Sequence, residues 1–214
     1  MTGGSGLTPA YLAGTRNFLS LSIPQPIHGD RWPEGNDFSR QLYAFNYFNP
    51  ESGLSMFRQG ALDVVSAVRF IRENLGEGGA IAEQFPGLKV NTDAIYFLGH
   101  SQGGMTGAVA IPFAPEIKAW ALSGAGGGTS MQVMQGENPI VIRDALATGI
   151  NAPEGTEFFE MHPVMGLVQA LVERADPINY APLWIRESEG PPVSVLLTEG
   201  LHDTSTPPDT SEAL

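Results

Sequence analysis

The sequence predicts an α/β protein with a parallel sheet, and three observations support this class. Short apolar runs typical of buried strands occur at residues 94–98, 117–123 and 193–197. Helical periodicity precedes the first run, and a stretch of small residues with helical character follows it. Strands that alternate with helices usually pair in parallel and carry helices on both faces of the sheet. The length of 214 residues is enough for one domain with a sizeable core.

The first part of the chain predicts one strand and one long helix. Residues 18–23 combine apolar and serine side chains in the alternation typical of a strand, until Pro24 interrupts the run. A polar and aromatic loop is expected from residue 25 to about residue 52. Residues 57–75 predict a helix, because apolar side chains recur about every 3.6 positions and Gly76 stands where a helix ends.

The later elements are predicted from the same kinds of pattern. Residues 94–98 are wholly apolar, as expected of a central parallel strand that is buried on both faces. The helix after this strand is expected to end at Pro112, because proline cannot continue the helical hydrogen bonding. Residues 117–123 and 193–197 predict two further strands, and a glycine-rich loop at residues 124–128 follows the first of them.

Residues 124–190 interrupt the alternation of strands and helices, and we interpret them as an inserted cap. Large apolar side chains stand there among polar and proline-rich turns: Met131, Met134, Phe158, Phe159, Met161, Met165, Leu167 and Leu171. Flexible methionines and aromatic rings suit an adaptable apolar pocket. Most of these side chains are nevertheless expected simply to pack the insertion onto the sheet.

Composition excludes several functional classes. The net charge of −12 disfavours nucleic acid and anionic lipid as partners, and the 11 lysines and arginines do not cluster. The chain has no cysteine, so disulfides and thiolate chemistry are excluded. No group of histidine and acidic residues has metal-ligand spacing, and no Gly-x-Gly-x-x-Gly opens a helix after the first strand. We therefore expect neither a metal nor another cofactor.

The sequence does not place the protein in a compartment. No apolar run reaches the length of about 18 residues that a transmembrane helix needs, so no transmembrane segment is expected. Residues 1–6 lack the basic and apolar regions of a signal peptide. Secretion and a cytoplasmic location both remain open, and so does the oligomeric state.

The most informative stretch lies at residues 99–104, between an apolar run and a helical pattern. It reads Gly99, His100, Ser101, Gln102, Gly103 and Gly104. A serine on a sharp turn between a strand and a helix, flanked by glycines, presents its hydroxyl as a nucleophile. Gly-x-Ser-x-Gly alone is a weak signal in a chain with 26 glycines, so the strand and helix patterns around it support the prediction. The alternative is a glycine turn that holds an incidental serine.

The neighbours of Ser101 have supporting roles in this hypothesis. The three glycines of the stretch permit close backbone approach at the turn. His100 adjoins the nucleophile, but we expect its side chain to point away from that of Ser101. The N–H of Gln102 lies at the positive end of the following helix, where it is expected to bind a developing oxyanion.

Over most of its length the chain resembles the α/β-hydrolase superfamily, on its esterase and lipase side. Residues 99–104 are similar to the nucleophile elbow of that family, which is the most specific element. Residues 16–31 resemble its fourth strand and the loop that follows, and residues 57–75 resemble the helix before the nucleophile strand. Residues 198–207 resemble the loop that carries the acid of the catalytic triad in a Gly-x-x-Asp-x-x-x-Pro pattern, which implies Asp203.

The resemblance implies a partial α/β-hydrolase fold. Residues 1–214 are expected to form a single domain with residues 124–190 as its cap or lid. In this family the chain order is serine, then acid, then histidine, yet no histidine lies between Asp203 and Leu214. The catalytic histidine is therefore expected beyond Leu214, and the first strands with the second oxyanion donor before the start. Without its base, the 214-residue chain alone is expected to be nearly inactive.

The four histidines of the chain are weaker candidates for the base. His28 lies in an early loop, where we expect it to bond to the backbone. His162 lies in the cap before the acid, so as a base it would break the usual order. His202 adjoins Asp203, and adjacent residues of an extended chain point in opposite directions. An alternative triad that keeps the order is Ser101, Asp176 and His202.

The function that these residues predict is hydrolysis of a carboxylic ester through an acyl-enzyme on Ser101. The expected substrate is a small-molecule or lipid ester with an uncharged acyl chain. A peptidase or amidase on the same scaffold is one alternative, because the attack by serine is the same in both reactions. A non-catalytic binding protein on a hydrolase scaffold is the other, and the absence of a histidine after Asp203 is its main support.

Overall fold

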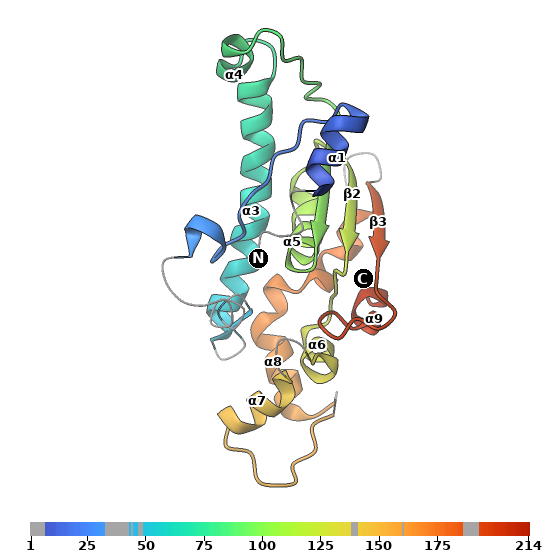
Figure 1. Ribbon diagram of the computed structural model, residues 1–214. Helices are drawn as coiled ribbons and strands as arrows, with labels where there is room; N and C mark the ends of the chain where they lie inside the picture. The colour runs from blue at the N-terminus through green and yellow to red at the C-terminus, as the bar shows by residue number, and fades with distance from the viewer. Residues whose placement is uncertain are drawn as a thin grey trace.

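The computed structural model describes residues 7–32, 43, 45–46, 49–137, 141–159, 161–185 and 193–214. The elements of these parts, with α for α-helices, η for 3₁₀-helices and β for strands, are shown in Figure 1. In chain order they are α1 (Leu7–Arg16), η1 (Gly29–Arg31), α3 (Pro50–Leu75), α4 (Ala80–Gln84), β1 (Ile95–His100), α5 (Gln102–Ala110), η2 (Ile111–Phe113), β2 (Ile117–Ser123), α6 (Thr129–Gln135), α7 (Ile142–Gly149), α8 (Pro163–Val172), η3 (Glu173–Ala175), η4 (Pro177–Asn179), η5 (Ala181–Trp184), β3 (Ser194–Thr198) and α9 (Pro208–Glu212).

The described strands form a three-stranded parallel sheet in the order β1-β2-β3. In its register Leu98 pairs with Ala121, which pairs in turn with Leu196. The sequence prediction of a mixed α/β protein with a parallel sheet is confirmed. Strand β2 has the predicted bounds, whereas β1 and β3 each begin one residue later than predicted.

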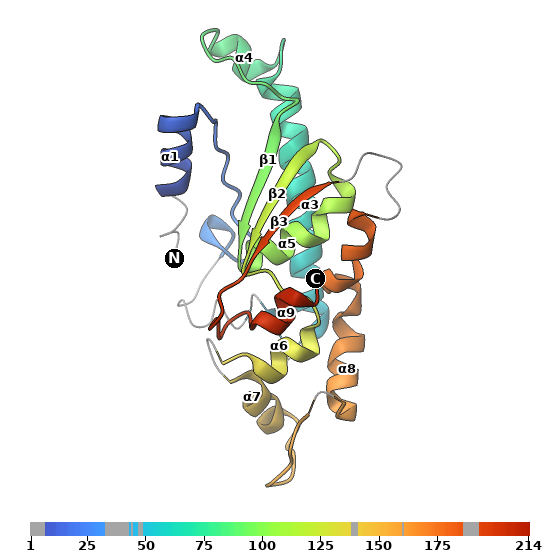
Figure 2. The same ribbon diagram turned by 90° about the vertical axis from the view of Figure 1, so that its right-hand side faces the viewer.

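One face of the sheet forms the core with α3 and α5, which lie against it (Figure 2). Trp120 and Leu122 on β2 are buried here, and Phe97 on β1 packs against Trp120 with 4.9 Å between ring centroids. The two helices approach closely at Gly60, where an added Cβ would lie 2.8 Å from Cγ2 of Thr106 on α5. This packing places α5, and with it the turn at Ser101, firmly against the sheet.

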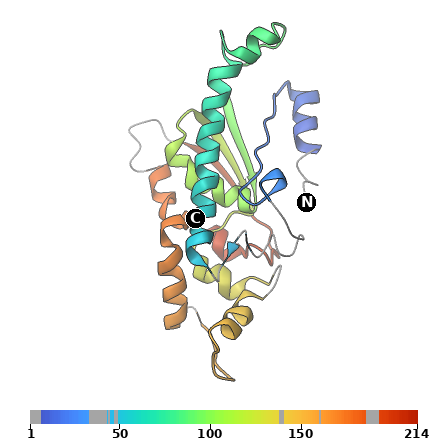
Figure 3. The same ribbon diagram turned by 90° about the vertical axis from the view of Figure 1, so that its left-hand side faces the viewer.

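The opposite face of the sheet is largely exposed, which corrects the expectation that β1 is buried on both faces. Leu98 is 57% exposed, and Tyr96 and Leu196 on the same face are also more than half exposed. Helix α1 lies on this side of the sheet (Figure 3), and Phe18 after it meets the ring of Tyr96 edge-on at 5.7 Å. An apolar run alone cannot show whether a strand is covered on one face or on both.

The strand predicted at residues 18–23 is absent from the sheet. This segment is extended, but the structure assigns it no ladder. Phe18, Leu19 and Leu21 remain exposed in this unpaired segment. Extended conformation and apolar content are local properties, whereas a strand also needs a partner for its backbone hydrogen bonds.

Helix α3 begins seven residues earlier than predicted, at Pro50 rather than residue 57. The side chain of Asn49 caps the helix by accepting a hydrogen bond from the N–H of Ser52 at 3.4 Å, and proline occupies the first helical position. The predicted end at Gly76 is confirmed. The Asn-Pro-Glu start signal was present in the sequence, but the apolar periodicity becomes regular only later.

In its described residues, the segment between β2 and β3 forms α6, α7, α8 and three short 3₁₀-helices. Figure 1 shows α6 and α7 beyond the arrowheads of the strands, at the edge of the sheet where their carboxyl ends lie. Val133, Ile142, Leu146 and Met165 form a separate buried cluster in this segment. Several of its apolar side chains do not pack inward, since Phe159, Met161, Leu167 and Leu171 are exposed. Residues 138–140, 160 and 186–190 of the predicted cap lie outside the described residues.

Candidate active site

Ser101 occupies a strained turn between β1 and α5. It follows the last residue of the strand and is the N-cap of the helix, with φ +53° and ψ −122°. A non-glycine residue with positive φ is uncommon, and strain of this kind costs about 1–3 kcal/mol and clusters at functional sites. The turn is held by two hydrogen bonds: the N–H of Ser101 donates to the carbonyl of Ser123 at 2.8 Å, and the N–H of Met105 donates to the carbonyl of Ser101 at 3.0 Å.

Two glycines allow this turn to close. A Cβ on Gly99 would lie 2.4 Å from the carbonyl oxygen of Gly103, and a Cβ on Gly104 would lie 2.9 Å from the Cβ of Ala125. A Cβ on Gly103 would meet nothing within 4 Å, so Gly103 takes part through its backbone alone. The steric need for glycine is therefore at positions 99 and 104.

Gln102 is the first residue of α5, where backbone N–H groups have no intrahelical acceptor. This N–H therefore lies at the positive end of the helix dipole, the position on which the sequence-based expectation of an oxyanion donor depends. The side chain of Gln102 is also buried, and its Nε2 has no hydrogen-bond partner among the described residues.

Asp203 lies in the loop after β3, at the same edge of the sheet as Ser101. Its Oδ1 accepts hydrogen bonds from the N–H groups of Ser205 at 2.8 Å and Thr206 at 2.9 Å. Its Oδ2 points toward Gly124, where an added Cβ would be 3.5 Å away. Within the described residues no donor reaches Oδ2, so the carboxylate is oriented by one oxygen and keeps the other for a further donor.

The loop that carries Asp203 is fastened to the glycine loop after β2 and to the segment beyond α6. Four hydrogen bonds join these parts: Gly124 N–H to Thr198 O at 2.8 Å, Gly127 N–H to Thr210 O at 2.8 Å, Glu137 N–H to Thr204 O at 2.8 Å and Ser211 Oγ–H to Ala125 O at 2.7 Å. A Cβ on Gly126 would lie 2.4 Å from Oγ1 of Thr210. The glycine loop thus lets α9 approach closely, and these hydrogen bonds hold the loop of Asp203 against the segment after β2.

His100 lies next to Ser123 and Gly124 at the carboxyl end of β2. Its Nδ1 is 3.3 Å from Oγ of Ser123, its register partner on β2. The same added Cβ on Gly124 that would approach Asp203 would lie 3.7 Å from Cε1 of His100. His100 and Asp203 therefore both flank Gly124. The sequence patterns did not single out Ser123 and Gly124 as site residues, because only the sheet register brings them to His100.

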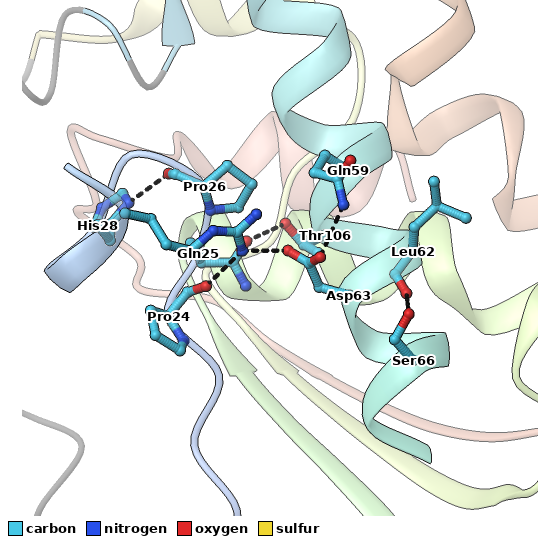
Figure 4. A network of polar contacts seen from close by, with 10 residues as sticks. Pro24, Gln25, Pro26, His28, Gln59, Leu62, Asp63, Ser66 and Thr106 are labelled. Carbon is cyan, nitrogen blue, oxygen red and sulfur yellow. Dashed lines mark hydrogen bonds and ion pairs between the residues drawn. The ribbon is translucent and has the colours of Figure 1, made fainter. Parts of the chain in front are cut away.

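His28 bonds to the backbone, as expected from its place in a loop. Its Nδ1 lies 3.0 Å from the carbonyl oxygen of Pro26. Figure 4 shows this loop held against α3 and α5, with Gln25 accepting a hydrogen bond from Thr106 at 3.1 Å. Arg31 completes the attachment through an ion pair with Asp63 on α3. These contacts give His28 a structural environment against α3 and α5.

The other two histidines are also not brought to Ser101 and Asp203 together. His162 is the N-cap of α8, where its Nδ1 accepts from the N–H of Val164 at 3.2 Å and its ring lies against Phe158. His202 is exposed in the loop of the acid. Among the described residues, no histidine hydrogen-bonds to both a Ser101 oxygen and Asp203.

Asp176 has a structural environment instead of a histidine partner. It is only 1% exposed, and its carboxylate accepts five hydrogen bonds. The donors are Gly128 N–H at 2.9 Å, Thr129 N–H at 2.7 Å, Thr129 Oγ1–H at 3.0 Å, Gln169 Nε2–H at 2.8 Å and Ile178 N–H at 3.1 Å. The structure therefore does not bring Asp176 and His202 together, and Asp176 supports the start of α6.

Metal-binding clusters and membrane-spanning helices are both absent from the described parts of the chain. No group of three or more histidine, cysteine and acidic residues gathers there in a way that could hold a metal ion. No helix within those parts is long and apolar enough to cross a membrane.

The arrangement as a whole places a serine hydroxyl and a carboxylate at one edge of a parallel sheet. Ser101 follows β1 and Asp203 follows β3, with β2 between them. Comparison of the chain with protein-family models, curated proteins and solved structures found no match.

Proposed function

We propose that this protein is a serine hydrolase of carboxylic esters, of the α/β-hydrolase type, with Ser101 as its nucleophile. The observation that most strongly supports the proposal is the backbone of Ser101, whose φ of +53° holds a non-glycine residue in a strained strand-to-helix turn. Such strain persists only where the surrounding structure enforces it, and a nucleophile elbow is one reason to enforce it. An incidental serine in a glycine turn has no such requirement.

In the proposed reaction the Ser101 hydroxyl oxygen attacks the ester carbonyl carbon while a base takes its proton. The N–H of Gln102 stabilises the negative charge on the carbonyl oxygen. The tetrahedral intermediate then collapses, the alcohol leaves with the proton from the base, and an acyl-enzyme remains. Water attacks the acyl-enzyme through the same steps and releases the carboxylic acid.

Asp203 is proposed to hold the base. Its Oδ1 is engaged by two backbone N–H groups, and Oδ2 remains for the N–H of an imidazole. The resemblance to hydrolases implies a histidine after Leu214 in this role. Since the described residues do not assemble the base, imidazole added from solution can replace it in a test of Ser101 as the nucleophile.

The test measures hydrolysis of p-nitrophenyl acetate by the protein and by Ser101→Ala over a series of imidazole concentrations. General base catalysis contributes about 10²–10⁴-fold, so we expect imidazole to raise the rate of the unaltered protein well above that of Ser101→Ala. Mass spectrometry of the quenched reaction should locate the acetyl group on Ser101. Equal rates for both proteins at every imidazole concentration would refute the proposal. Parallel assays with the corresponding p-nitroanilide measure the rate of amide hydrolysis and so test the amidase alternative.

A further inference from the structure

A small cavity lies against α5, one helical turn after Ser101. Its volume is about 20 Å³. It is enclosed by parts of α3, α5, α6, α8 and the 3₁₀-helices that follow α8. The lining residues are Phe45, Gly53, Leu54, Phe57, Met105, Thr129, Gln132, Val172, Ala175 and Pro177.

The lining of this cavity is uncharged and mainly apolar. Leu54, Phe57, Met105 and Ala175 are buried and form one cluster, which Phe45 joins. A charged group that entered would lose its hydration without gaining an ionic partner, which is strongly unfavourable. The cavity therefore suits a small apolar substituent.

Helix geometry directs the cavity toward the nucleophile. Residues four positions apart lie on the same face of a helix, and their side chains tilt toward its N-terminus. Met105 stands four positions after Ser101, and its N–H donates to the carbonyl of Ser101 at 3.0 Å. Met105 thus connects the lining of the cavity to the turn of Ser101 through the backbone of α5.

The other side of the cavity is tied to the acid. Gln132 on α6 lines the cavity, and its Nε2 lies 3.4 Å from the carbonyl oxygen of Ser205, in the loop that Asp203 orients. Thr129 lines it as well and donates to Asp176 through its backbone and its hydroxyl. The cavity therefore lies between the helix that follows the nucleophile and the helix that contacts the loop of the acid.

We propose that this cavity is the acyl subsite of the Ser101 hydrolase and that it selects short, uncharged acyl groups such as acetyl and propionyl. This inference rests on the proposed function. A volume of about 20 Å³ is close to the space of one water-sized sphere, which a methyl group fills. Each further methylene must displace buried side chains such as Leu54 or Met105, and well-packed interiors resist such insertion.

The test measures kcat/KM for p-nitrophenyl acetate, butyrate and octanoate under the imidazole conditions described above. The unaltered protein should prefer acetate. Met105→Ala enlarges the cavity and should raise the octanoate-to-acetate ratio about tenfold or more, because one methylene in an apolar pocket changes discrimination about 10–200-fold. Met161→Ala is the matched control, since Met161 is 86% exposed and does not line the cavity, and it should leave the ratio unchanged.

Two more variants keep the test decisive if Met105→Ala does not fold. Leu54→Val removes a single methylene from another wall and should shift the ratio in the same direction as Met105→Ala. Ala175→Leu fills the cavity and should lower the Ser101-dependent rate with acetate about tenfold. Thermal unfolding of each variant identifies those that remain folded, and only these are compared.

The outcomes separate this inference from the proposed function. A preference for octanoate in the unaltered protein, or the same ratio in folded enlarged and filled variants, overturns the acyl subsite while Ser101-dependent turnover persists. Absence of any Ser101-dependent turnover overturns the proposed function, and the acyl subsite with it.

Discussion

At the scale of single residues, the constraints on positions 99 and 101 come from backbone geometry rather than from side-chain packing. Ser101 has a positive φ that few non-glycine residues adopt. Two positions earlier, Gly99 lies so close to the carbonyl of Gly103 that no side chain fits. The hydroxyl is therefore held in place by the strand and helix on either side of it, and the turn itself tolerates little change.

A pair of glycine substitutions tests this geometry. Gly99→Ala should lower the free energy of unfolding by about 1–3 kcal/mol, because its Cβ meets backbone atoms that cannot move aside. Gly103→Ala adds the same atom where nothing lies within 4 Å, and a helical alanine should instead raise the free energy of unfolding by about 0.5–1 kcal/mol. Urea denaturation measures both values, and equal effects at the two positions would contradict the turn described here.

At the scale of elements, α6 depends on a carboxylate from a distant part of the chain. Asp176 accepts from Gly128 and Thr129 at the start of this helix, from Gln169 on α8 and from its own turn at Ile178. Because α6 also contacts the loop of Asp203 through Gln132, the buried Asp176 is linked through this helix to that loop.

Loss of this carboxylate should be costly. Asp176→Ala leaves one buried donor and four part-buried donors without their acceptor, and it should lower the free energy of unfolding by about 3–5 kcal/mol. Asp209 offers a control that contacts the same helix, since it accepts from Gln135 on α6 at 2.9 Å but is exposed. Asp209→Ala should change the free energy of unfolding by less than about 1 kcal/mol. Chemical denaturation that finds a small loss for Asp176→Ala would show that these bonds contribute little.

Elements also differ in how well their sequences predict them. The bounds of β2 and the end of α3 follow from apolar runs and from glycine, which act over a few residues. Residues 18–23 have a pattern of the same kind, yet they form no ladder and leave Leu19 and Leu21 exposed. The difference lies in the partner strand and the covered face, which local pattern does not contain.

At the scale of the whole molecule, the sheet has one packed face and one exposed face. Parallel sheets are usually covered on both faces. The exposure of Tyr96, Leu98 and Leu196 on one face of this sheet is therefore unusual. The two faces should therefore contribute very differently to stability.

Alanine substitutions on neighbouring strands test this asymmetry. Leu122 is 1% exposed, and Leu122→Ala should lower the free energy of unfolding by about 2–5 kcal/mol. Leu98 faces the opposite side and is exposed, so Leu98→Ala should lower it by less than about 1 kcal/mol. Thermal or urea unfolding measures both. A loss at Leu98 as large as that at Leu122 would mean that this face is covered in solution.

The sequence by itself determined the elements that carry the candidate chemistry. The turn at Ser101 and the parallel sheet followed from short patterns of apolar, glycine and polar residues, whose effects are local. The choice of Asp203 came instead from the resemblance of its loop to that of a known family. Only the tertiary structure decided which side chains meet. Asp176 joins Gly128 across 48 positions, and Thr106 joins Gln25 across 81. His100 and Asp203 likewise flank Gly124 only through the register of the strands. Contacts of this range depend on how whole elements pack, which no local pattern specifies.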